Sequence, residues 1–322
     1  MSFESPLPHD FPFDPAYGYD LDALLRVPAP PEPDDFADFW RGLYAAARAT
    51  PPDLTLRPSG DGGSDDVDVF DVEFTSLGGA RIGGWLTRPR RGPVERGVVV
   101  GHGYGHREQP DLNLPIPRSA AIFPCARGFS RSRSPQFPDN AAEHVVHGIG
   151  SRETYAHGGS AADLLWSAAS ALVEAVPEAA ARLDYMGGSF GGGIGALALP
   201  WDDRIARAHL AVPSFGNHPL RLTLSCVGSG ESVRGYHREH PEVADVLRYF
   251  DAATAARHAR VPVHVAAALF DPAVPPPGQF AVYNALGGPK ELFVLTAGHF
   301  DYPAAEEENR RLREELVRFF AD

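Results

Sequence analysis

The stretch Gly187-Gly188-Ser189-Phe190-Gly191 decides the fold predicted for this chain of 322 residues. A short apolar run precedes it, and a run of small residues, 192–198, follows it. That order is typical of a strand, a sharp turn and a helix, with a serine exposed at the turn. The turn forces the serine into strained backbone angles, and flanking glycines let it do so without collisions. The helix start then directs N–H groups and its positive dipole end toward the serine oxygen.

A phosphate-binding loop is the alternative for a glycine-rich turn between a strand and a helix. That loop requires Gly-Lys-Ser or Gly-Lys-Thr, whereas this turn continues as Gly191-Gly192-Gly193. We therefore interpret Ser189 as a nucleophile, which needs a base to activate its hydroxyl.

Short apolar runs of the kind buried in a parallel sheet recur on both sides of this turn. They lie at residues 97–101, 120–123, 183–186, 209–212, 261–269 and 292–295, after a hairpin of two strands at 67–74 and 81–87. Helical patterns alternate with them. One is expected to begin at Ser160, three residues before Asp163 as in a capping box, and the last spans about 306–320. The alternation predicts an α/β fold, a mainly parallel sheet with helices on both faces.

The predicted organisation has three parts. Residues 1–33 are rich in proline and aromatic residues and are expected to form an extended arm. Residues 34–322 form the catalytic domain, and within it residues 213–257 interrupt the alternation of strands and helices. We expect this interruption to be a helical, cap-like insertion over the carboxyl ends of the strands, and hence over the active site.

The base and the acid follow from chain order. In the α/β-hydrolase fold the order is serine, acid, histidine. His299 lies between the last predicted strand and the last helix, and Asp271 directly follows the penultimate strand. Asp251 and Asp301 are the alternative acids. Other histidines have a structural interpretation, namely His102 in a glycine-rich loop and two in apolar runs, His209 and His264.

The oxyanion of an acyl-transfer intermediate needs two backbone N–H donors. One is expected from Phe190, the residue after the nucleophile. The other is expected from the loop Gly101-His102-Gly103-Tyr104-Gly105, whose glycines allow close approach to a substrate. We assign it to the N–H of Tyr104.

Composition narrows the possible partners. A net charge of −13 disfavours nucleic acid and anionic membranes as partners. The sequence has no run of 18 apolar residues, so no membrane span is predicted. Two cysteines cannot form a disulfide framework or a metal site. The first residues lack the pattern of a secretory signal. The sequence thus predicts a cytoplasmic protein that acts on a small acylated substrate without metal or cofactor.

With these positions in place, the chain resembles the acetyl xylan esterase and cephalosporin-C deacetylase family of carbohydrate esterases. The resemblance runs from about Pro28 to the end and rests on motifs at 102–105, 127–128, 188–192, 249–251 and 271–291. It implies that Ser189, Asp271 and His299 are nucleophile, acid and base, and that Tyr104 is the oxyanion tyrosine. It also implies an intracellular homo-oligomer that prefers short acyl groups, especially acetyl.

Three positions depart from the family pattern. Phe129 and Phe190 each stand where the family has glutamine, and Phe300 stands where it has glutamate. The change at Phe190 spares its backbone N–H. We expect the rings of Phe129 and Phe300 to lie at the substrate pocket and to make its mouth less polar.

The predicted function is therefore a serine carboxylesterase that removes short acyl groups, chiefly acetyl, from sugars or other small alcohols. Two alternatives stay open at this point. A serine peptidase or amide hydrolase would use the same triad, and a silent binding protein could retain the fold without activity.

Overall fold

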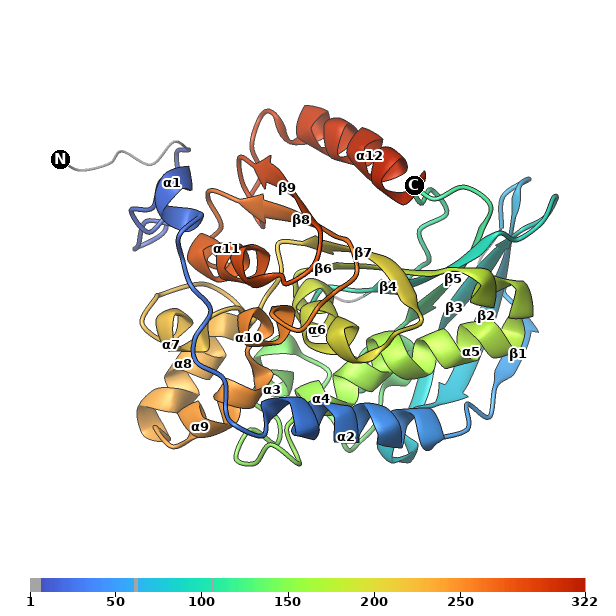
Figure 1. Cartoon of the computed structure of the whole chain (residues 1–322), viewed down its shortest axis with the longest axis horizontal. Coiled ribbons are helices and arrows are strands. Elements are labelled where there is room, and N and C mark those ends of the chain that lie inside the picture. The colour runs from blue at the N-terminus through green and yellow to red at the C-terminus, as the bar shows by residue number, and fades with distance from the viewer. Residues whose placement is uncertain (1–6, 61–62, 106, 322) are drawn as a thin grey trace.

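A nine-stranded sheet forms the centre of the molecule (Figure 1). The computed structural model describes residues 7–60, 63–105 and 107–321, so residues 1–6 of the predicted arm and residue 322 of the predicted domain lie outside it. The strand order is β1-β2-β3-β5-β4-β6-β7-β8-β9. Pairs from β1 to β3, and β3 with β5, are antiparallel, whereas all pairs from β5 to β9 are parallel. The predicted mainly parallel sheet, opened by an antiparallel hairpin, is confirmed.

Every predicted strand is present. The strands are β1 (Thr55–Pro58), β2 (Val67–Thr75), β3 (Arg81–Pro89), β4 (Arg96–Gly101), β5 (Ser119–Pro124), β6 (Leu183–Gly188), β7 (Ile205–Ala211), β8 (Val263–Ala268) and β9 (Lys290–Leu295). β1 was not predicted, because a four-residue edge strand that ends in proline carries no alternating pattern. β7 begins at Ile205 rather than at 209, because Arg207 interrupts the apolar run although its backbone pairs with β6.

Helices cover both faces of the sheet. They are α1 (Leu21–Leu24), α2 (Phe36–Ala49), α3 (Ala141–His144), α4 (Ala156–Ala161), α5 (Ser167–Ala175), α6 (Phe190–Ala198), α7 (His218–Arg221), α8 (Ser229–Glu239), α9 (Val243–Leu247), α10 (Ala252–Ala256), α11 (Pro276–Ala285) and α12 (Ala305–Ala321). β4 shows why both faces are buried. Val99 packs in the cluster that includes α2, α5 and α6, while Val98 and Val100 pack with α12 on the opposite face. A strand covered on both sides reads as a continuous apolar run.

The helix expected to begin at Ser160 begins earlier. α4 starts at Ala156 and continues through a π-helical turn, Ala162–Trp166, into α5. Ser160 therefore lies inside the helix, and its hydroxyl donates to the carbonyl of Ala156 at 3.0 Å. The capping-box prediction is wrong at this position, because Asp163 forms a buried ion pair with Arg127 instead.

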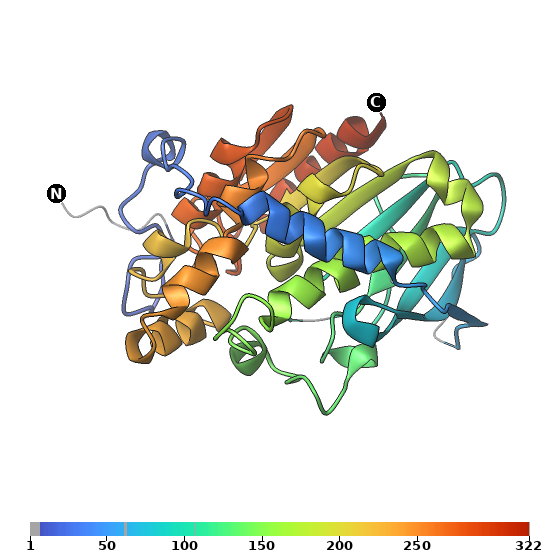
Figure 2. The same cartoon turned by 60° about the horizontal axis from the view of Figure 1, so that its bottom comes forward.

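Residues 7–33 cross the surface next to α7, α10 and α11, as Figure 2 shows for the segment that leads into α2. The carbonyls of Pro28 and Ala29 accept side-chain N–H groups from Asn217 and Arg257, each at 2.9 Å. The segment is not wholly irregular as predicted, because α1 forms one turn that is capped by the Asp20 side chain.

The interruption at 213–257 is helical, as expected, and carries α7 to α10. Its description as a separate cap remains a prediction. Within the described part of the chain, no helix has the length and apolar character needed to cross a membrane.

Candidate active site

Ser189 sits in a strained turn between β6 and α6. Its backbone angles are φ 54° and ψ −115°, outside the regions that serine ordinarily adopts. A side chain at Gly187 would approach the carbonyl oxygen of Gly191 to 2.6 Å, and one at Gly191 would approach that of His102 to 2.8 Å. Both glycines are thus required by close packing, as the sequence predicted.

The end of β7, the loop that follows it and helix α6 hold the strained serine in place. Its N–H donates to the carbonyl of Ala211 at the end of β7 at 2.9 Å. Its carbonyl accepts the N–H groups of Gly193 and Ser214 at 2.9 and 3.1 Å. These backbone bonds leave the hydroxyl as the group that faces the histidine loop.

His299 links Ser189 to Asp271, although the three residues lie far apart in the sequence. Its Nδ1 lies 2.8 Å from Oδ2 of Asp271, and its Nε2 lies 2.9 Å from Oγ of Ser189. A carboxylate only accepts, so Nδ1 carries the proton and the bare Nε2 accepts the serine O–H. This is the tautomer in which histidine can take a proton from serine.

The loop before His299 is shaped to meet the acid. A side chain at Gly298 would come within 2.4 Å of Oδ2 of Asp271, so only glycine lets the two loops approach. The N–H of Gly298 donates to the carbonyl of Phe270 at 2.8 Å. His299 itself has φ 48°, a second strained position in the site.

Asp271 is fully buried and its carboxylate is surrounded by donors. Oδ1 accepts the backbone N–H groups of Ala273 and Val274, both at 2.9 Å. Oδ2 accepts His299 and also the side-chain amide of Gln279 at 2.9 Å. The buried carboxylate thus has four hydrogen-bond donors, which fix its orientation toward His299.

Gln279 is a residue that sequence reasoning missed. It is fully buried on α11, donates to Asp271 and to the carbonyl of Val274, and accepts the N–H of Ala268 at 2.8 Å. Its amide therefore bridges β8 and the acid loop. No motif marks a glutamine eight residues after the acid, so only the fold brings them together.

The pKa of His299 is raised by its partner. Burial lowers the pKa, but the hydrogen bond and the charge of Asp271 outweigh burial and hold it above the ordinary value of 6.5. A general base works only in its neutral form, so we expect kcat/KM for an acetyl ester to fall as pH drops through this raised pKa. A pH profile of kcat/KM should show a midpoint above 6.5, and a midpoint below it would contradict this geometry.

The predicted oxyanion donors flank the serine. Phe190 is the first residue of α6, directly after Ser189. The loop of Tyr104 passes close by, since a side chain at Gly103 would lie 3.4 Å from Cβ of Ser189. The rings of Tyr104 and Phe190 stack with centroids 4.1 Å apart. Phe190 and the loop of Tyr104 therefore lie next to the nucleophile, and the role of their N–H groups as oxyanion donors remains a proposal.

The three phenylalanines that depart from the family pattern do not together line the mouth of the substrate pocket, as was predicted for Phe129 and Phe300. Phe129 and Phe190 are fully buried, and Phe129 packs on His144 at 4.7 Å and on Tyr104 at 5.7 Å. The prediction that Phe129 lines the substrate pocket is wrong, because its ring lies in the core behind Tyr104. Phe300 is half-buried and contacts Phe270 at 5.0 Å and Phe11 of the arm at 6.0 Å, so its role at the pocket remains a prediction.

The other histidines and the alternative acids considered from the sequence have surroundings that differ from those of the triad. His102 is buried, and its Nε2 accepts the N–H of Ala126 at 2.9 Å, in agreement with a structural role. His209 and His264 are buried and contact each other through their Nδ1 atoms. Asp251 accepts the backbone N–H groups of His218 and Thr254, so its carboxylate caps a helix, whereas Asp301 is exposed.

The sequence of this chain matches a known family. The sequence profile described as acetyl xylan esterase (AXE1) matches residues 20–320. The chain belongs to the acetyl xylan esterase family. An acetyl esterase from Xylanibacter ruminicola is 22% identical over 294 residues, which are 84% of this chain and 64% of that relative. The chain thus spans less than two thirds of that relative's length.

Solved structures agree on the fold. Acetyl xylan esterase 1 from Thermoanaerobacterium sp. superposes with a TM-score of 0.79 at 22% identity, over 94% of this chain and 99% of that one. The acetyl xylan esterase from Paenibacillus sp. R4 superposes with a TM-score of 0.75 at 23% identity, over 92% and 99%. The family resemblance and the α/β-hydrolase fold predicted from the sequence are confirmed.

Proposed function

We propose that this acetyl xylan esterase family member is a serine carboxylesterase that removes acetyl groups through an acyl-enzyme. One observation carries the proposal, the continuous hydrogen-bonded line from Asp271 through His299 to Ser189. Family membership supports the ester as substrate. These three hydrogen-bonded residues supply a nucleophile, a base in the required tautomer and a buried carboxylate to stabilise the imidazolium.

The reaction proceeds in two halves. Oγ of Ser189 attacks the ester carbonyl carbon while Nε2 of His299 takes its proton, and the N–H groups of Tyr104 and Phe190 bind the carbonyl oxygen as it becomes negative. The carbon–oxygen bond to the alcohol then breaks, and His299 returns the proton to the leaving alcohol. Water attacks the acyl-enzyme with His299 as base, which releases the carboxylic acid and restores the serine hydroxyl.

We expect a small acyl pocket. Acetyl esters should be cleaved best, with kcat/KM lower by about tenfold or more at butyryl and lower still at octanoyl, because a pocket discriminates about 10–200-fold per methylene. A series of p-nitrophenyl esters measures this directly. A maximum at octanoyl would contradict the acetyl preference and leave the triad assignment intact.

The alcohol side of the substrate is proposed from the family alone. Acetylated sugars are the first candidates, and the acetyl group of cephalosporin C is the second. Comparing an acetate ester with the matching acetanilide tests the peptidase or amidase alternative, which requires the anilide to be cleaved at a comparable rate.

The resemblance also supports a cytoplasmic homo-oligomer. Both cysteines, Cys125 and Cys226, are free thiols in the structure, which suits a reducing compartment. Light scattering of the purified full chain would give its mass relative to the 34.7 kDa of one protomer, and a mass of one protomer would contradict the oligomer.

A further inference from the structure

The hydroxyl of Tyr104 is held between two buried histidines. Its oxygen lies 3.2 Å from Nδ1 of His144 and 3.2 Å from Nε2 of His157. Both histidines are fully buried, while Tyr104 itself is half-buried because its loop reaches the site. Neither histidine contacts Ser189 or His299 through a hydrogen bond among the described residues, so the triad does not account for them.

Only one assignment of donors and acceptors fits the hydrogen bonds of Tyr104, His144 and His157. Nε2 of His144 lies 3.1 Å from the carbonyl oxygen of Arg127, which can only accept, so Nε2 carries the proton and Nδ1 is bare. Tyr104 therefore donates its O–H to His144, and its oxygen accepts the Nε2–H of His157. Burial lowers the pKa of His144 to about 4 and that of His157 well below its usual value, so both are neutral as this pattern requires.

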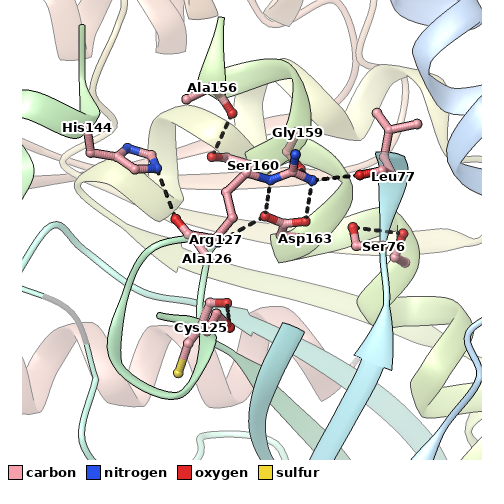
Figure 3. A network of polar contacts seen from close by, with 12 residues as sticks. Ser76, Leu77, Cys125, Ala126, Arg127, His144, Ala156, Gly159, Ser160 and Asp163 are labelled. Atoms are coloured by element: carbon pink, nitrogen blue, oxygen red, sulfur yellow. Dashed lines mark hydrogen bonds and ion pairs between the residues drawn. The ribbon is translucent and has the colours of Figure 1, made fainter. Parts of the chain in front are cut away.

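The chain of hydrogen bonds that runs from Tyr104 through His144 ends at Arg127, whose ion pair with Asp163 is shown in Figure 3. Nε and Nη2 of Arg127 bind the two carboxylate oxygens of Asp163 at 2.8 and 2.9 Å, and the backbone N–H of Arg127 donates to the same carboxylate at 3.0 Å. Nη2 also donates to the carbonyl of Leu77 at 3.0 Å. A bidentate ion pair that is fixed in this way holds the backbone of Arg127, and hence the acceptor of His144, in one place.

The other end of the chain reaches both proposed oxyanion donors. The ring of Tyr104 stacks on Phe190 with an interplanar angle of 21°. The two residues whose backbone N–H groups are proposed to bind the oxyanion are therefore in direct contact through their side chains. A hydroxyl fixed at one edge of this stack limits sliding of the loop relative to the start of α6.

We propose that His144 and His157 are positioning residues of the oxyanion hole, acting through the Tyr104 hydroxyl to fix the N–H of Tyr104 beside Ser189. The inference rests on the proposed function. It assigns the tyrosine side chain a role separate from its backbone, since the hydroxyl contacts two buried histidines.

Tyr104→Phe is the direct test, because it removes one oxygen and keeps the stacked ring. Complete loss of an oxyanion donor costs about 10²–10³ in kcat, so a displaced donor should lower kcat/KM for p-nitrophenyl acetate about tenfold. KM should stay within about threefold, since the contact matters mainly in the transition state. The affinity for phenyl trifluoromethyl ketone, whose serine adduct places an oxyanion in the hole, should fall by the same factor as kcat/KM.

Two controls separate positioning from general destabilisation. Tyr155→Phe removes another buried hydroxyl, which donates to the carbonyl of Val145 at 2.8 Å, and should lower Tm while kcat/KM stays within about twofold. His144→Asn puts a carbonyl oxygen near the position of Nδ1 and should recover most of the activity lost in His144→Leu.

The proposal is overturned if Tyr104→Phe keeps wild-type kcat/KM and inhibitor affinity, or if His144→Asn is no better than His144→Leu at equal Tm. Those outcomes leave the proposed function standing as long as Ser189→Ala is inactive. If Ser189→Ala keeps full activity, the proposed function fails and this inference fails with it.

Discussion

Replacing Ser189 with alanine should abolish ester hydrolysis. Removal of a triad nucleophile lowers kcat by about 10⁴–10⁶ because no other group can form the acyl-enzyme. Oγ of Ser189 is the atom that Nε2 of His299 faces at 2.9 Å, so the deletion removes the reacting atom itself. Hydrolysis of p-nitrophenyl acetate and labelling by a fluorophosphonate probe should both disappear.

The fold should survive this change. Alanine keeps the same Cβ in the strained turn, and the backbone bonds of residue 189 to Ala211, Gly193 and Ser214 do not use the hydroxyl. Tm should therefore stay within about 3 °C of the wild type. Ser170→Ala is a matched control on α5, where the serine hydroxyl contacts Arg48 and Arg204, and should keep kcat within about twofold. Retention of a tenth of the activity by Ser189→Ala would show that another residue is the nucleophile.

Asp271→Asn should be the second most damaging change, with a loss of about 10⁴ in kcat. The surroundings dictate how the new amide must sit. Two backbone N–H groups point at the Oδ1 position, so the amide oxygen belongs there and the NH₂ takes the place of Oδ2. That NH₂ then faces two former donors, Nδ1 of His299 and the amide of Gln279. His299 can accept from it only by moving its proton to Nε2, and a protonated Nε2 cannot take the proton of Ser189.

Asp301→Asn is the matched comparison. Asp301 lies two residues after His299 and is exposed, so its charge is screened by solvent. We expect its kcat to stay within about threefold of the wild type. If Asp301→Asn proved the more damaging of the two, the acid would have to be reassigned.

Local sequence determined the elements that carry the reaction. Gly187, Gly191 and Gly298 are each required because any side chain there would make a contact under 3 Å, so these glycines mark the two turns in the sequence. The apolar runs predict the strands, because a strand that is buried on both faces carries few polar side chains. Chain order then limited the acid and the base to residues at the ends of the last strands, Asp271 and His299, and the fold places both beside Ser189.

Only the tertiary structure decided what surrounds these groups. Gln279 beside the acid, the two histidines on Tyr104 and the burial of Phe129 arise from packing between elements distant in the sequence. The sequence alone predicted Phe129 at the pocket because an aromatic residue in a motif near the site is equally compatible with a wall or with the core. Hydrophobic periodicity specifies which face of an element is buried, whereas the partner of each buried polar atom depends on how whole elements pack. The reactive atoms were therefore predictable from the order of residues, and the donors that position them were set by the fold.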